Sequence, residues 1–389
     1  MKKLLYISTI IIYLCTLWSC EVEIVPPEMD DNNPFTVTAL AVDGEPLNVN
    51  LSWTEKIDTA LSAPYSDSYV MWRVLNMLDT AEHIIIGSDD TLYYTEDTTL
   101  FYDYYKKNVV TDATVSANIN GQVIEMNYNP STLNYENSNY KVKAGDRIRI
   151  NVTKKKYNKY QEGFKIIEST SQIEVPTHTP DVEIIKTNKI YKECEKYLPL
   201  GNKEFAVDSV VVFTLKLKSP NPGINCFRLK VSSIMTSFYT EDDIIPTTIT
   251  PISAYHSNDV LLYDSSLDKG FGPWPANQTD VFTDESFHNG EYIIDVSSRV
   301  SCPYYLTVSD DNDITRYFEI ELQPITPMLM NYLSVLYRLR IATPSYFSEP
   351  TSLPSNIEGS VGIFGGIGKS KKIRYFFPGE EDPRIPPAD

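Results

Sequence analysis

Residues 113–128 read "ATVSANINGQVIEMNY", and they carry the strongest β-hairpin signal in the chain. Alternating segments flank Asn120-Gly121, a dipeptide that readily takes the positive φ angles of a tight two-residue turn. Turn-punctuated alternation extends from Phe35 to about Pro176. It includes "FTVTALAV" and "LNVNLSW" on either side of Asp43-Gly44, and the further strand "KAGDRIRINVTKK". The first half therefore predicts a β-rich domain.

The second half repeats this pattern after a proline-containing segment. Strands are predicted at "DSVVVFTLKLKS", "CFRLKVSS", "GEYIIDVSS" and "TRYFEIELQPI", the first two joined by a proline-glycine turn. Pro176 and Pro180 cannot donate hydrogen bonds to a sheet, so we place a domain boundary between the halves. Several short strands at this spacing favour a β-sandwich.

One segment departs from the strand pattern. Thr326 can serve as the N-cap of a helix and Pro327 as its first residue. Apolar residues then recur on one helical face, namely Leu329, Leu333, Leu336 and Tyr337. We therefore predict a mostly-β chain with one helix near 327–341.

The N-terminus predicts a lipoprotein leader. Lys2 and Lys3 precede an apolar run too short to cross a bilayer but typical of a signal peptide. The run ends at "LWSC", which resembles a bacterial lipobox and makes Cys20 the lipidated first residue of the mature chain. An ordinary cleaved signal peptide is the alternative. The acidic residues after Cys20 predict a disordered tether, and they resemble a signal for export to the outer face of the outer membrane.

These features give the predicted organisation of the chain. Residues 1–19 form the signal peptide, 20–34 the tether and 378–389 a proline-rich tail. Residues 35–176 form an immunoglobulin- or transthyretin-like β-sandwich domain. Residues 177–377 form a β domain like fibronectin type III, with the helix inserted.

Charge and cysteine usage exclude several classes. The chain has 34 basic and 52 acidic residues and a formal net charge of −18. This argues against nucleic-acid binding and against docking on anionic lipid through a basic patch. Among Cys194, Cys226 and Cys302, three disulfide pairings are open and one thiol must be left over. The absence of C-x-x-C spacing suggests neither a zinc site nor a redox motif.

Chemical motifs are weak. "VGIFGGIGKS", residues 361–370, has Ile363 where a phosphate-binding P-loop requires glycine, and proline-rich sequence follows instead of a helix. The four histidines show no metal-ligand spacing. "SDDNDI", residues 309–314, is better explained as a solvated turn than as a calcium loop. We therefore expect no cofactor, no metal and no catalytic activity.

Aromatic residues provide the candidate binding sites. In "DKGFGPWPANQTD", residues 268–280, Phe271 and Trp274 could form an exposed platform for sugar rings or peptide side chains. Burial in a core or a protein interface is the alternative. A second candidate is a tyrosine cluster made of Tyr93, Tyr94, Tyr102, Tyr104 and Tyr105.

The order of these pieces resembles a family of Bacteroidetes outer-membrane lipoproteins catalogued as domain of unknown function 4249. The resemblance rests on the lipid cysteine, on the hairpin and on a set of shared segments. These segments are "VKAGDRIRINV", "SPNPGINCFRLKV", "SNDVLLYD", "VFTDESFHNGEYIIDV", "MNYLSVLYRL" and above all "PSYFSEPTSLPSNIEGSVGIFGG" at 344–366. The chain departs from the family at Cys226-Phe227, where aromatic pairs are usual.

The resemblance implies a function. Such proteins often accompany TonB-dependent importers of the SusC/SusD kind, so we expect a surface-exposed outer-membrane lipoprotein that captures a peptide or glycan. A surface hydrolase, an adhesin and a structural subunit are the alternatives. The glycines of "NIEGSVGIFGG" are then a structural signature that permits a bulge, a sharp turn or a close backbone approach. Asn356 and Glu358 are expected to satisfy backbone groups of that turn, and ligand binding is the alternative.

Overall fold

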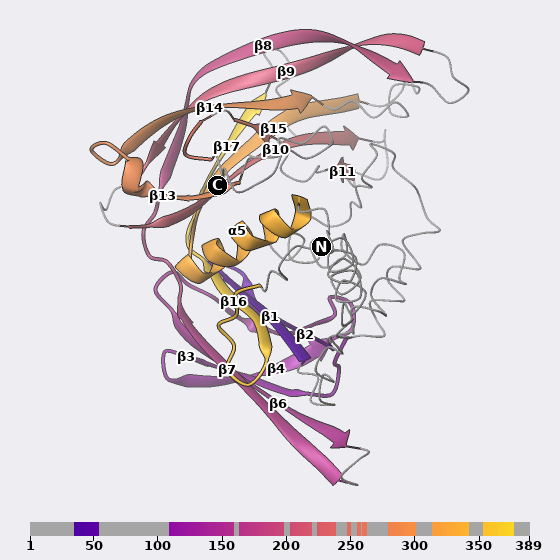
Figure 1. Cartoon of the computed structure of the whole chain (residues 1–389), viewed down its shortest axis with the longest axis vertical. Coiled ribbons are helices and arrows are strands. Elements are labelled where there is room, and N and C mark those ends of the chain that lie inside the picture. Colours follow the sequence, from indigo (N-terminus) through magenta and orange to yellow (C-terminus); the bar gives the residue numbers. More distant parts are fainter. Residues whose placement is uncertain are drawn as a thin grey trace, which may run out of the picture. The chain divides into compact units, whose positions relative to one another are not determined.

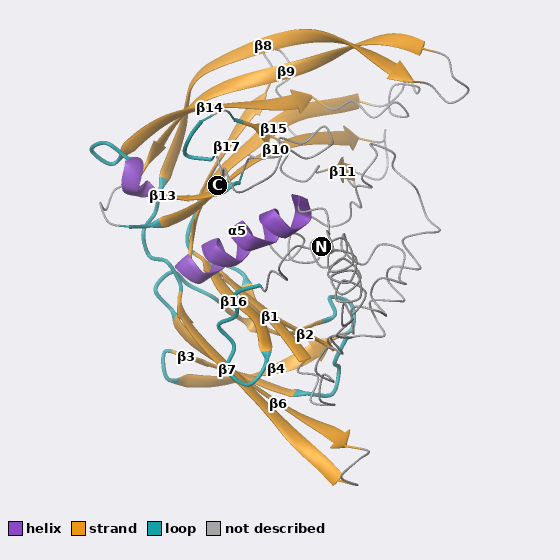
Figure 2. Cartoon of the chain, viewed as in Figure 1, coloured by secondary structure: helices purple, strands orange, loops and turns teal. Residues whose placement is uncertain are grey.

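The computed structural model describes residues 35–53, 109–158, 163–197, 203–219, 224–238, 247–249, 255–257, 259–262, 279–300, 313–341 and 353–376. Contacts divide the chain into residues 1–33 and 34–389, and every described residue belongs to the second unit. The fold is mostly β, as predicted (Figure 2). No helix in these ranges has the length and hydropathy that a membrane-spanning segment requires.

The first group of strands confirms the local hairpin signals. Asn120 and Gly121 have φ angles of 53° and 92°, which shape the turn between β3 and β4. Gly44 has a φ of 84° between β1 and β2. The strands are β1 (Phe35–Val42), β2 (Pro46–Trp53), β3 (Thr114–Ile119), β4 (Gln122–Asn129), β5 (Asn134–Lys141), β6 (Arg147–Asn158) and β7 (Gly163–Glu174).

These strands enclose one hydrophobic core. Inward side chains of β1 and β2, such as Val37 and Leu51, share a cluster with Ile148 and Ile150 of β6. All four are fully buried. Alternation of period two thus places one face of each strand in the core and the other outside it.

The second group of strands forms two sheet segments around another core. The strands are β8 (Asp181–Tyr197), β9 (Lys203–Lys218), β10 (Cys226–Phe238), β11 (Thr247–Ile249), β12 (Tyr255–His256), β13 (Val281–Thr283), β14 (Glu291–Val300), β15 (Asp313–Ile325) and β17 (Lys371–Phe376). A short 3₁₀ helix, η1 (Asp284–Ser286), follows β13. One sheet has the order β12-β14-β9-β8, whereas β10 pairs with β11, β13 and β15, and β17 pairs with β15.

Consecutive strands β9 and β10 therefore belong to different sheets (Figure 1). Their inner faces meet in a core rich in aromatic residues. Phe213 of β9 contacts Phe318 of β15 and Tyr375 of β17 edge-on, with ring centroids 5.1 and 5.3 Å apart. These aromatic contacts hold β9 against the sheet that contains β15 and β17, to which the chain crosses after β9.

Helix α5 (Pro327–Ile341) confirms the predicted helix. Leu329, Leu333 and Leu336 are buried against a third cluster that includes Ile363 and Ile367. The carbonyl of Thr326 accepts a hydrogen bond from the N–H of Met330, while its hydroxyl accepts one from the N–H of Gly366. The N-terminal end of the helix is thereby attached to the final part of the chain. The side chain of Tyr337 lies outside the described residues.

The strand β16 (Val361–Ile367) joins segments from opposite ends of the sequence. It pairs in parallel with β1 along seven positions, from Thr36↔Val361 to Val42↔Ile367. It also pairs with β15 at Ile325↔Ile367. A segment that we assigned to the second predicted domain thus completes the sheet of the first. The boundary near Pro176 and the assignments as immunoglobulin-, transthyretin- and fibronectin-like stay predictions.

Candidate functional site

The sequence-predicted site residues stay predictions. Cys20, Phe271 and Trp274 lie outside the described residues, as does the tyrosine cluster of residues 93–105. Cys194 has no described side chain, Cys302 lies outside the described ranges, and Cys226 is a buried free thiol. Within the described ranges, no three His, Cys, Asp or Glu side chains gather as metal ligands.

The glycine-lysine stretch, residues 361–370, forms β16 and the three residues that connect it to β17. Gly365 lies against α5, where an added Cβ would come within 2.9 Å of Leu329. Gly368 lies against the chain at Pro176, whose carbonyl oxygen would be 2.3 Å from such a Cβ. β17, not a helix, follows Lys369 and Ser370. The glycines of this stretch therefore allow close approaches to neighbouring segments, as the structural interpretation predicts.

Asn356 pairs with the backbone of β16 through its side chain. Its Oδ1 accepts the N–H of Phe364 at 2.8 Å, and its Nδ2 donates to the carbonyl of Phe364 at 2.9 Å. Phe364 is fully buried. The amide therefore acts as one residue of a neighbouring strand. The backbone groups that it satisfies belong to β16, whereas we expected those of a turn.

The same segment also attaches to β7. The backbone N–H and carbonyl of Glu358 exchange hydrogen bonds with Thr170 at 2.9 and 3.1 Å, and the Ser171 hydroxyl donates to the Asn356 carbonyl at 2.7 Å. Glu358 thus contributes through its backbone. Gly359 has a φ of 81°, and a Cβ there would lie 2.0 Å from a carbonyl oxygen of β7. This is the close backbone approach that we expected of the glycines.

A buried carboxylate organises the region between β9 and β10. Asp284 accepts hydrogen bonds from the Ser219 hydroxyl at 2.7 Å, from the Asn225 backbone N–H at 2.8 Å and from the Asn225 amide at 2.7 Å. The hydroxyl donates to the carboxylate directly, whereas a Ser-His-Asp triad requires an imidazole to take the hydroxyl proton. This cluster therefore fixes the ends of the strands.

Two titratable groups near Asp284 are held in their neutral forms. His178 packs edge-on against Phe227, with ring centroids 5.2 Å apart. Burial lowers the pKa of His178, although the charge of Asp284 opposes the shift. Burial, with a contribution from the same charge, raises the pKa of the Cys226 thiol to about 11. Both shifts favour the neutral form of the group.

One ion pair is buried under the face of β10 that carries Cys226. The guanidinium Nε of Arg228 lies 2.7 Å from Oδ2 of Asp280, and the two side chains are 1% and 8% exposed. Arg228 pairs across the ladder with Gln323 of β15, which is also buried. The pair connects β10 to the segment that enters β13. Its burial and its role in joining strands are those of a structural ion pair.

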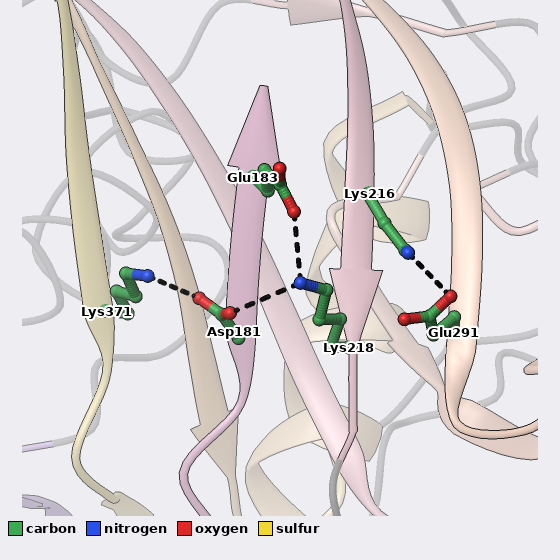
Figure 3. Close-up of polar contacts among 6 residues, drawn as sticks. All are labelled: Asp181, Glu183, Lys216, Lys218, Glu291 and Lys371. Atoms are coloured by element: carbon green, nitrogen blue, oxygen red, sulfur yellow. Dashed lines mark hydrogen bonds and ion pairs between the residues drawn. The ribbon is translucent and has the colours of Figure 1, made fainter. Parts of the chain in front are cut away.

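Charged side chains of alternating sign cover the outer face of the four-stranded sheet near β17 (Figure 3). Lys218 lies 3.0 Å from Glu183 and 3.7 Å from Asp181, and Lys371 reaches Asp181 at 2.6 Å. Although partial burial acts to raise the pKa of Asp181, the hydrogen bond and charge of Lys371, with Lys218, lower it overall. The hydrogen bond to Glu183 raises the pKa of Lys218.

This charged face has little capacity to select a ligand. Lys216 pairs with Glu291 at 2.7 Å, so each of the three lysines drawn has a carboxylate partner. Exposed ion pairs of this kind contribute little to stability, because solvent screens them. The face is a solvated surface with compensated charge.

A different surface stands out at the far end of the β6–β7 hairpin. Phe164 and Ile166 are 74% and 55% exposed, and Lys155 and Lys165 are exposed beside them. The register places Lys155 opposite Ile166. Sequence reasoning missed this surface. The signal that could have found it is "KKKYNK" at residues 154–159, a basic run in an acidic chain.

A comparison with known protein families supports the family resemblance that we based mainly on the closing motif, residues 344–366. The model of the family described as domain of unknown function (DUF4249) matches residues 84–373. This is well over half of the chain, which therefore belongs to that family. No curated protein and no solved structure matches the chain significantly.

Proposed function

We propose that this protein is a non-catalytic lipoprotein on the outer face of the outer membrane, where it assists a TonB-dependent importer of the SusC/SusD kind. The observation that carries the proposal is the lipobox-like "LWSC" ending at Cys20, in a chain that belongs to the DUF4249 family. A β-rich body behind an acidic tether suits a module that works at a membrane surface.

The mechanism is capture. A tethered module raises the local concentration of its ligand near the importer, because the anchor converts a diffusing encounter into a local one. Phe271 and Trp274 are the proposed contacts for a glycan or peptide. The cluster around Asp284 supports the non-catalytic reading, because its serine hydroxyl is bonded to a carboxylate without an intervening imidazole.

The test is isolation of the tagged protein from its native outer membrane in mild detergent, followed by mass spectrometry. Stoichiometric recovery of a TonB-dependent channel and its lid lipoprotein would support the proposal. Recovery of the protein alone would contradict the importer role and favour free-standing binding or adhesion. Turnover of a glycan or peptide by the purified protein would establish the hydrolase alternative.

Anchoring is tested by a matched pair of cysteine substitutions. Cys20→Ala should release the protein from the membrane fraction, because the lipobox then lacks the thiol that would be lipidated. Cys226→Ala changes a buried thiol of the described structure and should leave the protein in the membrane. If Cys20→Ala stays membrane-bound with its leader removed, the lipoprotein assignment is wrong.

A further inference from the structure

The β6–β7 hairpin continues beyond the sheet that supports it. β6 pairs with β3 only from Ile148 to Thr153. Its pairing with β7 goes on to Asn158↔Gly163, so residues 154–158 and 163–167 form a two-stranded ribbon (Figure 1). Five further residues at about 3.3 Å each extend the ribbon roughly 16 Å past β3.

The ribbon combines positive charge with exposed apolar surface. Its ten residues include Lys154, Lys155, Lys156 and Lys165 but no aspartate or glutamate. The side chain of Lys154 is largely buried, and its ammonium group forms an ion pair with Asp112. Lys155 and Lys165 are exposed, as are Phe164 and Ile166 on the opposite strand from Lys155.

The charge of the ribbon is opposite to that of the whole chain, whose formal net charge is −18. From this whole-chain charge alone we expected no docking on anionic lipid through a basic patch, and the ribbon revises that expectation. At physiological ionic strength the Debye length is about 8 Å, so charges farther away are largely screened. The ribbon extends about twice that distance beyond β3. A surface in contact with its end therefore meets the local lysines more than the acidic remainder of the chain.

We propose that the end of this ribbon docks on an anionic lipid surface. Lysine ammonium groups bind the phosphates of lipid headgroups, while Phe164 and Ile166 enter the boundary between headgroups and acyl chains. Cationic side chains beside exposed aromatic and aliphatic ones are typical of surfaces that lie in a membrane interface. An acidic protein is the rival occupant of this surface, and the test below distinguishes it from a lipid surface. The inference goes beyond the proposed function, because it adds a membrane contact that is independent of Cys20.

The test uses vesicle flotation with the mature chain, residues 20–389 carrying Cys20→Ser, so that no lipid anchor contributes. Removal of residues 1–19 leaves the compact unit 34–389 intact. The probes are phosphatidylcholine vesicles with and without about one third phosphatidylglycerol, at low and high salt. We expect binding to the anionic vesicles, weakened by salt, and little binding to the neutral ones.

Two ribbon variants and one control separate the contributions. K155E/K165E should lower the partition coefficient by roughly 25-fold or more, since each lysine contributes roughly fivefold. F164S/I166S should lower it roughly tenfold or more through lost apolar contact. The control, K186E/I293S, changes an exposed lysine and an isoleucine that is 59% exposed on the four-stranded sheet. It should bind as the parent chain does.

Several outcomes would overturn the proposal: no binding to anionic vesicles, equal loss in the control, or full retention in both ribbon variants. Circular dichroism of each variant checks that the fold is kept. Binding to acidic proteins but not to vesicles would assign the ribbon to a protein partner instead. None of these results affects the importer proposal, which is tested by isolation from the native membrane.

Discussion

The pairing of Asn356 with β16 leads to a quantitative prediction for the family motif. Asn356→Ala removes the side-chain partner of both the N–H and the carbonyl of Phe364, a residue with 0% exposure. A buried backbone group without a partner costs about 1–3 kcal/mol. Partial relaxation of the neighbouring loop should keep the total near the lower end, so we expect a loss of about 2–4 kcal/mol in the free energy of unfolding.

Asn137 provides a matched control for this substitution. Its amide also donates to a backbone carbonyl, that of Glu125 at 2.9 Å, and accepts a backbone N–H, that of Asn139 at 3.0 Å. These two hydrogen bonds are exposed, so water can replace the lost partners. Asn137→Ala should therefore cost less than about 1 kcal/mol.

Urea unfolding followed by tryptophan fluorescence measures both variants. Asn356→Ala should lower the urea midpoint with an unchanged slope, since a changed slope would report an altered unfolded or native surface. If Asn356→Ala costs no more than Asn137→Ala, the inference that the amide completes the edge of β16 is refuted.

Asn356→Asp adds a dependence on pH. The ionised carboxylate can still accept the Phe364 N–H, but it cannot donate to the Phe364 carbonyl, whereas the protonated acid can. The folded state therefore favours the protonated form, and the folded pKa of the new carboxyl lies above its ordinary value of about 3.9. The stability of this variant relative to wild type should be highest below that ordinary pKa. It should fall as pH rises through the folded pKa.

Three further predictions concern other described residues. Arg228→Met should lower the free energy of unfolding in urea by about 3–5 kcal/mol, because it leaves the Asp280 carboxylate buried without its cation. The double variant Arg228→Met/Asp280→Leu should recover most of that loss. Equal losses in the single and double variants would contradict the role of the pair. The Cys226 thiol should react with a disulfide reagent at pH 8 only after denaturation, because burial raises its pKa to about 11. Rapid reaction of the folded protein at this site would show that the thiol is accessible. Lys371→Ala should raise the pKa of Asp181, because it removes a cation that lowers this pKa in the wild type. The variant should be less stable than the wild type near neutral pH, and the difference should vanish as pH falls below the lowered pKa of Asp181 in the wild type. A difference that persists at about pH 2 would place its cause elsewhere.

Local signals predicted the elements well because the relevant physics is local. Asn120-Gly121 dictates its hairpin through φ angles that few other residues accept, and Pro327 begins the helix where we predicted it. The apolar face of that helix was also predicted, since Leu329, Leu333 and Leu336 are buried.

Long-range pairing was not predictable in the same way. Nothing in "VGIFGGI" indicates that it pairs with β1, more than 300 positions earlier in the sequence. Alternation in "CFRLKV" shows that Arg228 lies on the opposite face from Phe227, but not that this face is covered as well. The burial of Arg228 depends on where other segments pack.

The candidate sites show the same limit. The assignment of Cys20 relies on a short processing motif, and that of Phe271 and Trp274 on composition, so packing could confirm neither. The basic ribbon is visible in the sequence as a run of lysines, but the net charge of the whole chain, −18, does not reveal this local cluster of positive charge. Its significance required the register, which shows that the two strands continue past β3.

The parallel pairing of β1 with β16 has a consequence for biogenesis. During synthesis and export β1 is among the first strands to emerge and its partner β16 is among the last. A strand edge that waits for a distant partner is a site for wrong pairing, and contacts so far apart in sequence form slowly. We therefore expect the first sheet to stay open until the chain is nearly complete. A chain truncated before residue 361 would leave that edge of β1 without its partner, so quality control of this protein depends on its last strands as much as on its first.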